Sequence, residues 1–168
     1  MALTVSIAAT LAFVLVARQR VSFYGDDYIG FHGVVTQSVR QFLLTPIDVH
    51  FIPLHKLATW LIYRIAPLNF DVALAVMCAF HLLGLWTLYR TLRLLGASWL
   101  SAPLTALCAV NVYGGVLLLG WSAGIARLAY ILLSIAAIYH YLRFRESGSW
   151  GRLATVVACV VAAAAFFS

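Results

Sequence analysis

Five stretches of the chain consist almost entirely of apolar residues, and each approaches the length of a membrane-crossing helix. A helix needs about 20 apolar residues to cross the hydrocarbon core of a bilayer. Because 64% of the 168 residues are hydrophobic and only 10% are charged, a soluble domain of this composition would aggregate. We therefore predict an all-α polytopic transmembrane helix bundle, with spans at about residues 2–17, 70–95, 99–119, 125–142 and 153–167.

The two ends of the chain bear on its organisation. The first apolar run could be mistaken for a signal peptide, but Arg18 and Arg20 follow it, whereas the charged region of a signal peptide precedes the apolar run. The run therefore predicts a first transmembrane helix or signal anchor. The last run stops at Ser168 with no flanking charge. This ending predicts that residues 1–168 are the N-terminal part of one transmembrane domain in a longer polypeptide.

Arginines cluster after the second and fourth spans, at Arg90, Arg93, Arg143, Arg145 and Arg152. The positive-inside rule places both clusters in the cytoplasm, so the loop at residues 18–69 and the turn at 120–124 are predicted to face outward. The basic residues of the first loop oppose this assignment, but the rule weakens when charges are spread over about 50 residues. Because the arginines lie at segment ends and form no basic face, we expect no nucleic-acid partner.

The long first loop carries helical patterns. From residue 26, apolar side chains recur every three or four positions, at Tyr28, Phe31, Val35, Val39 and Phe42. This pattern predicts an amphipathic helix over about 26–44, lying in the membrane interface. A second interfacial helix is predicted over about 53–66, since proline is tolerated in a first turn and Pro67 would stop the helix.

Asp26 and Asp27 are two of only five acidic residues, and they follow the first span directly. Neighbouring carboxylates can supply a general base or hold a divalent cation on oxygen ligands. The alternative is structural: Asp26 would cap the helix that starts there, and Asp27 would complement its dipole. Both interpretations stay open on the spacing alone.

Other candidate residues are basic. His50, His55 and Lys56 surround the start of the second loop helix, where they would contact a phosphate or assist a metal; the alternative is a set of solvated interfacial side chains. Their spacing matches no zinc motif. Arg127 lies near the start of the fourth span, where it would either extend to the headgroups or bind a lipid phosphate.

The order of three motifs resembles the GT-C superfamily of polytopic glycosyltransferases, which take sugars from polyprenyl-phosphate donors. Tyr24-Gly-Asp-Asp-Tyr28 heads a large external loop, and His50-Phe-Ile-Pro-Leu-His55 leads toward the second long span. Gly120-Trp-Ser-Ala-Gly-Ile-Ala-Arg-Leu128 then opens the fourth span. Unlike many members, the chain has no acid in that second external turn.

The resemblance implies a multi-pass enzyme of the bacterial inner (cytoplasmic) membrane with an extracytoplasmic active-site loop. Asp27 or Asp26 would be the catalytic base, with Asp27 preferred, and both would hold a divalent cation, Mg²⁺ or Mn²⁺, where one is used. His50, His55, Lys56 and Arg127 would bind a polyprenyl-phosphate-linked sugar in the lipid bilayer. The acceptor would be a glycan, a lipid or a protein, attacked with inversion at the sugar.

Two other classes compete with the enzyme. A transporter or lipid-handling protein would explain the apolar spans, but the acids cluster near a membrane surface and not at mid-membrane, where such proteins bind their substrates. A small structural subunit would need no chemistry from Asp26 and Asp27 at all. Loss of activity in Asp27→Asn at unchanged expression would argue against both.

Overall fold

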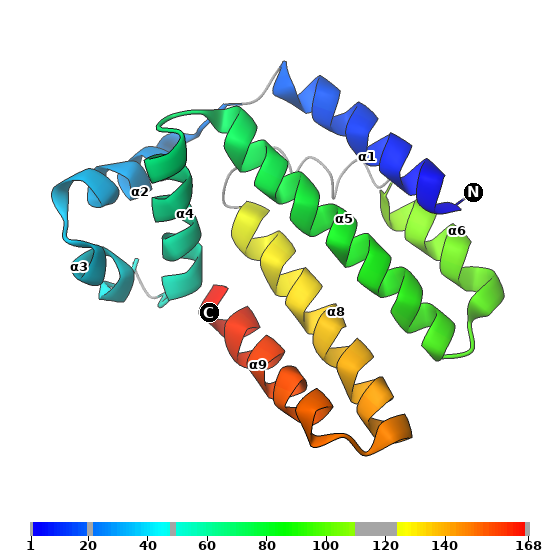
Figure 1. Ribbon diagram of the computed structural model, residues 1–168. Coiled ribbons are helices and arrows are strands. Elements are labelled where there is room, and N and C mark those ends of the chain that lie inside the picture. Colours follow the sequence, from blue (N-terminus) through cyan, green and yellow to red (C-terminus); the bar gives the residue numbers. More distant parts are fainter. Residues whose placement is uncertain (1, 20–21, 48–49, 110–123, 167–168) are drawn as a thin grey trace.

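The computed structural model describes residues 2–19, 22–47, 50–109 and 124–166. In these ranges the chain is helical, and the only β pairing is an isolated antiparallel bridge between Ile47 and His50. The helices, shown in Figure 1, are α1 (Ala2–Arg18), α2 (Gly25–Thr36), α3 (Val39–Leu44), α4 (Pro53–Ile65), α5 (Phe70–Leu94), α6 (Ser98–Ala109), α8 (Gly124–Ser147) and α9 (Trp150–Phe166). The predicted all-α class is confirmed for the described residues.

Two of these helices, α5 and α8, are long and apolar enough to cross a membrane. They have 25 and 24 residues, and 18-residue windows within them have mean hydropathies of 1.9 and 1.6. The apolar helices α1, α6 and α9 are shorter within the described ranges, so two of the five predicted spans correspond there to helices of full membrane-crossing length. The predicted fourth span, 125–142, continues to Ser147, and residues 110–119 of the third lie outside the described ranges.

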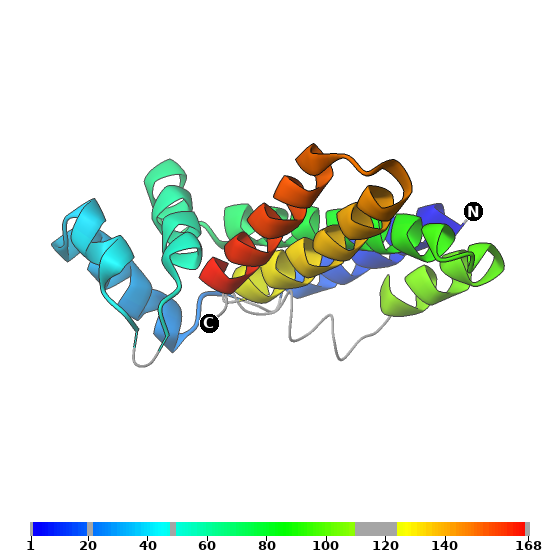
Figure 2. The same ribbon diagram turned by 90° about the horizontal axis from the view of Figure 1, so that it is seen from below.

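The long helices lie side by side in one layer. α5 packs against α1, α6 and α8, while α8 also packs against α9. Viewed at a right angle in Figure 2, α2, α3 and α4 form a separate group at one end of this layer. α4 connects the group to the layer through contacts with α8 and α9.

A buried apolar cluster joins the loop group to the beginnings of α5 and α8. Its members come from both parts: Phe23, Phe31, Ile62, Ala73, Leu74, Met77, Ile125 and Leu128. The ring of Phe23 meets those of Phe31 and Phe70 edge to face, with centroids 4.7 and 5.3 Å away. The apolar contacts therefore fix the start of the loop at the end of the layer where α5 and α8 begin.

The single helix predicted over 26–44 is wrong in one respect, because the structure divides it into α2 and α3. Ser38 lies between them with extended backbone, and its hydroxyl oxygen accepts a hydrogen bond from the Gln41 N–H at 3.3 Å. Gly33 allows the two helices to fold together, since a Cβ there would lie 3.0 Å from the Phe42 ring. A serine cap and a close glycine contact thus convert one amphipathic helix into a helical hairpin.

This hairpin also divides the predicted apolar stripe. Phe31 and Phe42 are buried, whereas Tyr28, Val35 and Val39 are exposed. The two phenylalanines therefore belong to the core of the loop group, whereas Tyr28 and the two valines face outward.

The second loop helix follows its prediction of 53–66 closely. Pro53 occupies the first turn of α4, and the helix ends at Ile65, two residues before Pro67. The ring of Pro53 removes an N–H that has no acceptor within the helix, which explains its tolerance there.

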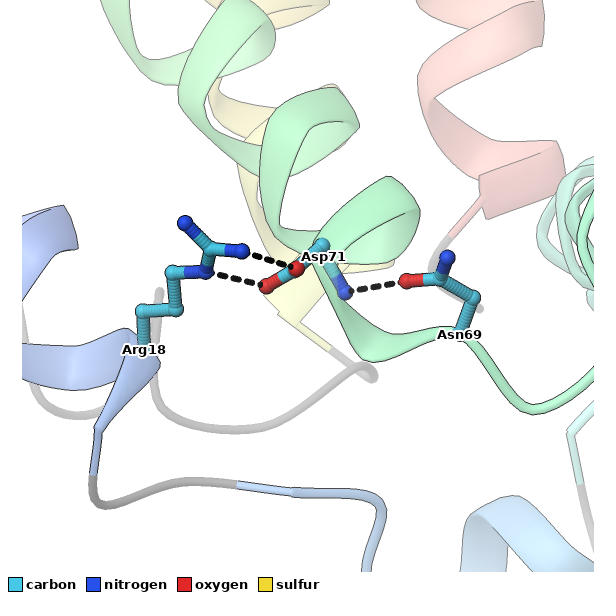
Figure 3. Close-up of polar contacts among 3 residues, drawn as sticks. All are labelled: Arg18, Asn69 and Asp71. Carbon is cyan, nitrogen blue, oxygen red and sulfur yellow. Dashed lines mark hydrogen bonds and ion pairs between the residues drawn. The ribbon is translucent and has the colours of Figure 1, made fainter.

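A pair of opposite charges connects the end of α1 to the start of α5 (Figure 3). The Arg18 guanidinium donates from Nε to one Asp71 oxygen at 2.9 Å and from Nη2 to the other at 2.8 Å. The Asn69 side chain caps α5 by accepting the Asp71 N–H at 3.0 Å. Because the pair is two-pronged, it fixes the relative direction of the two side chains as well as their distance.

We expect this ion pair to contribute little free energy of unfolding, because its side chains are 62% and 47% exposed. A double-mutant cycle with Arg18→Gln and Asp71→Asn should give a coupling of about 0.5 kcal/mol that shrinks as salt is added. Thermal unfolding of the purified protein measures it. A salt-independent coupling several times larger would contradict this expectation.

Candidate functional site

The first turn of α2 separates the two neighbouring carboxylates. The helix begins at Gly25, with Tyr24 as the N-cap residue. Asp27 is 8% exposed, and its Oδ2 accepts the backbone N–H of Tyr24 at 2.8 Å, while Asp26 is exposed. The expectation that Asp26 caps the helix is therefore wrong, because Asp27 is the residue whose carboxylate returns to the N-cap, as the third residue of a capping box does.

This division assigns the two carboxylates different capacities. Successive helical residues point about 100° apart, so Asp26 projects away from the surface that buries Asp27. A general base must approach a substrate hydroxyl to hydrogen-bond distance, which favours the exposed carboxylate. Asp27 instead stabilises the first turn of α2, which contains Asp26.

Exposed aromatic rings lie on both sides of the acids. Tyr24 is 71% exposed and Tyr28 is 53% exposed. The apolar pattern predicts Tyr28 to be part of the stripe of an interfacial helix, and it indicates no role for Tyr24. The sequence feature that could have identified them is the placement of one tyrosine on each side of Gly25-Asp26-Asp27. Tyrosine rings there offer flat amphipathic surfaces next to an acid.

The structure does not bring the acids together with His50, His55 and Lys56. The described contacts of α2 with α4 involve the middle and the second half of α4: a Cβ on Gly30 would lie 3.6 Å from the Thr59 side chain, and the ring centroids of Phe31 and Tyr63 are 5.3 Å apart. Phe23, which shortly precedes the acids, contacts Phe70 just after the end of α4, whereas the three basic residues lie at or before the first turn of α4.

Lys56 is buried between α3 and α4. The residue is only 4% exposed. Its ammonium group donates to the Phe42 carbonyl at 2.9 Å and to the Thr45 carbonyl. The same group lies 5.1 Å from the centre of the Phe42 ring. Burial lowers the pKa of Lys56 from its ordinary value. An ammonium group at the last carbonyls of a helix compensates both their unpaired lone pairs and the helix dipole, so the described contacts of Lys56 are structural.

The two histidines of this group have different surroundings. Burial, and to a smaller extent the charge of Lys56, lowers the pKa of His55 to about 4. Its Nδ1 is buried and has no hydrogen-bond partner among the residues that the structure describes. His50 is exposed, and its backbone pairs with that of Ile47 at 2.8 and 3.0 Å. His55 is therefore neutral at pH 7, and His50 is the accessible imidazole of the pair.

The low pKa of His55 predicts a pH-dependent stability of the loop group. The unfolded chain takes up this proton near pH 6.5, but the folded chain does so only near pH 4. The contribution of neutral His55 to the free energy of unfolding is therefore fully present above pH 6.5. It falls between pH 6.5 and 4, by at most about 1.4 kcal/mol per pH unit. Chemical unfolding at a series of pH values measures this slope. In the matched variant His55→Phe the part of the slope due to His55 should vanish, and an unchanged slope would contradict the assignment.

Arg127 lies at the same end of the bundle as the acids. It is half-buried in the first turn of α8, between Ile125 and Leu128 of the apolar cluster that also contains Phe23 and Phe31. Arg18 belongs to this end as well, through its ion pair with Asp71. The predicted binding residues are thus divided, with Arg127 at the end that carries Asp26 and the other three at the far end of α4.

Asp26 and Asp27 differ in their fit to a metal ion. Within the described ranges, no group of three or more His, Cys, Asp or Glu side chains is arranged to hold one. Magnesium is commonly held by one or two carboxylates together with substrate phosphates and water, and Asp26 can provide such a carboxylate. Asp27 is less suited because one of its oxygens accepts the Tyr24 N–H.

Comparison of the chain with protein-family models, with curated proteins and with solved structures found no match. The likeness to the GT-C superfamily accordingly rests on the three short motifs and their order.

Proposed function

We propose that the chain belongs to a membrane glycosyltransferase, which moves a sugar from a polyprenyl-phosphate donor to an acceptor at the extracytoplasmic face. The observation that supports this function is the exposed Asp26 on a turn held by the buried Asp27. This turn lies at the end of the layer where the two long apolar helices begin. A base at that position would act at a membrane surface, where a lipid-linked sugar is presented.

In the proposed reaction, Asp26 accepts the proton of the acceptor hydroxyl as its oxygen attacks the anomeric carbon of the donor sugar. The bond from that carbon to the phosphate oxygen breaks with inversion, and polyprenyl phosphate leaves with the bonding electrons. Arg127, at the same end of the bundle, would balance the charge that develops on the phosphate. Asp26 is the proposed base in place of Asp27, because of the two only Asp26 is exposed.

A divalent cation is compatible with the same site. Mg²⁺ or Mn²⁺ held by Asp26 and a donor phosphate oxygen would stabilise the leaving phosphate. Transfer that stops on addition of EDTA and returns with either metal would support this role. Transfer that is insensitive to EDTA would leave Asp26 as the base without a metal.

The test is a transfer assay on membranes that contain the complete reading frame of this protein. Polyprenyl phosphates carrying radiolabelled hexoses or pentoses are supplied in turn, and both released polyprenyl phosphate and acceptor-bound label are measured. Stoichiometric release and transfer for one donor is the expected result. If none of the donors gives release of polyprenyl phosphate, and circular dichroism shows that the protein is folded, the result would count against the glycosyltransferase.

One observation favours a non-enzymatic, lipid-handling protein as the second candidate. Tyr28, Val35 and Val39 are exposed apolar side chains on α2 and α3, as expected of helices that lie on lipid. Such a protein would bind the polyprenyl-phosphate sugar without releasing polyprenyl phosphate. Its binding would also be unchanged by Asp26→Asn, which distinguishes it from the enzyme.

A further inference from the structure

The end of the helix layer opposite Asp26 is rich in arginine. We call this surface the arginine end: it consists of Arg90 and Arg93 in the last turns of α5, Arg143 and Arg145 in the last turns of α8, and Arg152 in the first turn of α9. α5 and α8 run in the same direction, so their last turns lie together, and α9 starts beside them (Figure 1). Glu146 is the one acid in these turns, and it pairs with Arg143 at 2.7 Å.

Aromatic rings position the two arginines of α5. The Arg90 guanidinium lies 5.3 Å from the Tyr139 ring centre and 6.0 Å from that of Trp86, so it bridges α8 and α5. The Arg93 guanidinium lies 5.9 Å from the centre of the Tyr89 ring. Guanidinium groups above aromatic faces keep their N–H edges available for another acceptor.

Neither of these two arginines has a carboxylate partner within the described ranges, in contrast to Arg143. Both are exposed, and residues three apart on a helix occupy the same face. Two parallel N–H donors of guanidinium match the oxygens of phosphate, which makes an arginine pair a stronger phosphate site than a single charge. The pair therefore presents an unused, pre-positioned set of donors.

The position of the pair identifies the source of the phosphate. Arg90 and Arg93 end one of the two helices that are long and apolar enough to cross a membrane. Trp86, which is 42% exposed, stacks with Tyr89 just before them, as aromatic residues do at the boundary between hydrocarbon and headgroups. We propose that Arg90 and Arg93 bind the phosphate of an anionic phospholipid, in the leaflet opposite the Asp26 site. This binding is independent of the proposed enzyme.

The test measures which lipids stay on the protein. The complete protein is reconstituted in nanodiscs with equal amounts of phosphatidylglycerol and phosphatidylcholine, and retained lipids are counted by native mass spectrometry. Wild-type protein should retain phosphatidylglycerol preferentially, and Arg90→Gln/Arg93→Gln should lower this preference about tenfold. Arg40→Gln, an exposed arginine on α3, is the matched control and should leave the preference unchanged.

Several outcomes would overturn the proposal. These are an unchanged preference in the double variant, an equal loss in Arg40→Gln, or displacement of the retained lipid by excess inorganic phosphate. If the glutamine variant does not fold, the same lipid measurement on Arg90→Lys/Arg93→Lys tests the proposal. This variant keeps both charges but removes the paired donors, so its preference should fall about threefold, and a wild-type preference would refute binding by the guanidinium pair.

Discussion

Replacing Asp26 by asparagine is expected to lower sugar transfer by about 10²–10⁴-fold, the usual contribution of a positioned general base. Asparagine has nearly the same shape but cannot accept the acceptor proton. Because Asp26 is exposed, its substitution should leave the folded structure intact. The measurement is the initial rate of polyprenyl phosphate release at saturating donor, with circular dichroism to confirm equal folding.

Asp27→Asn is the matched control for this substitution, since it changes the neighbouring carboxylate in the same way. It weakens the hydrogen bond to the Tyr24 N–H, so we expect a loss of about 1 kcal/mol in stability and a smaller effect on the rate. The reverse pattern would contradict the role of Asp26. If Asp27→Asn abolished transfer while Asp26→Asn did not, Asp27 would be the base, as the sequence resemblance had implied.

Replacing Lys56 by methionine is expected to destabilise the α3–α4 contact by about 3 kcal/mol. Methionine retains most of the apolar stem but removes the ammonium group. The Phe42 and Thr45 carbonyls would then lose the donor that they share. The hydrogen bond to Phe42 is buried and that to Thr45 is partly buried, and a buried acceptor left unpaired costs about 1–3 kcal/mol. Hydrogen exchange of the α3 amides should be accelerated about 100-fold.

Arg64→Met provides the comparison within the same helix. Arg64 is exposed in the last turn of α4, and its guanidinium lies 5.4 Å from the centre of the Trp60 ring. Its removal should cost less than about 1 kcal/mol and should not change exchange in α3. Unchanged α3 protection in Lys56→Met would show that the ammonium does not hold this helix.

Helix positions were predictable wherever local signals agreed with the apolar pattern. Pro53 marked the start of α4, and the apolar run from residue 70 to 95 corresponds to α5 at Phe70–Leu94. Such boundaries depend on neighbouring residues alone. Whether α1 and α9 cross a membrane was less predictable, because apolar helices of 17 residues do not specify their own surroundings.

The division between α2 and α3 shows why periodicity was insufficient. The three- and four-residue spacing continues through Ser38, so the apolar pattern does not record the break. What determines the break is the packing of Phe42 onto Gly33, a contact formed only after the chain has turned. Ser38 was the available local signal, but serine also occurs within helices.

The candidate site was predictable in its residue types and much less so in its geometry. Asp26 and Asp27 were identified, but only coordinates distinguish the exposed carboxylate from the one that returns to the Tyr24 N–H. Lys56 looked like a surface charge because its acceptors, Phe42 and Thr45, lie 14 and 11 residues earlier. The Arg18–Asp71 pair, 53 residues apart, had no sequence signal at all.

That separation of 53 residues also sets a timescale for synthesis. At roughly 5–20 residues per second, α1 is complete roughly 3–10 s before Asp71 leaves the ribosome. The other helix that packs against it, α6, is made later still. During this interval α1 has neither of these partners, whereas in the folded chain Thr10 of α1 is only 1% exposed. Insertion factors or chaperones that recognise unpaired helices would therefore meet this protein first at α1, and substitutions there should affect its yield more than its final stability.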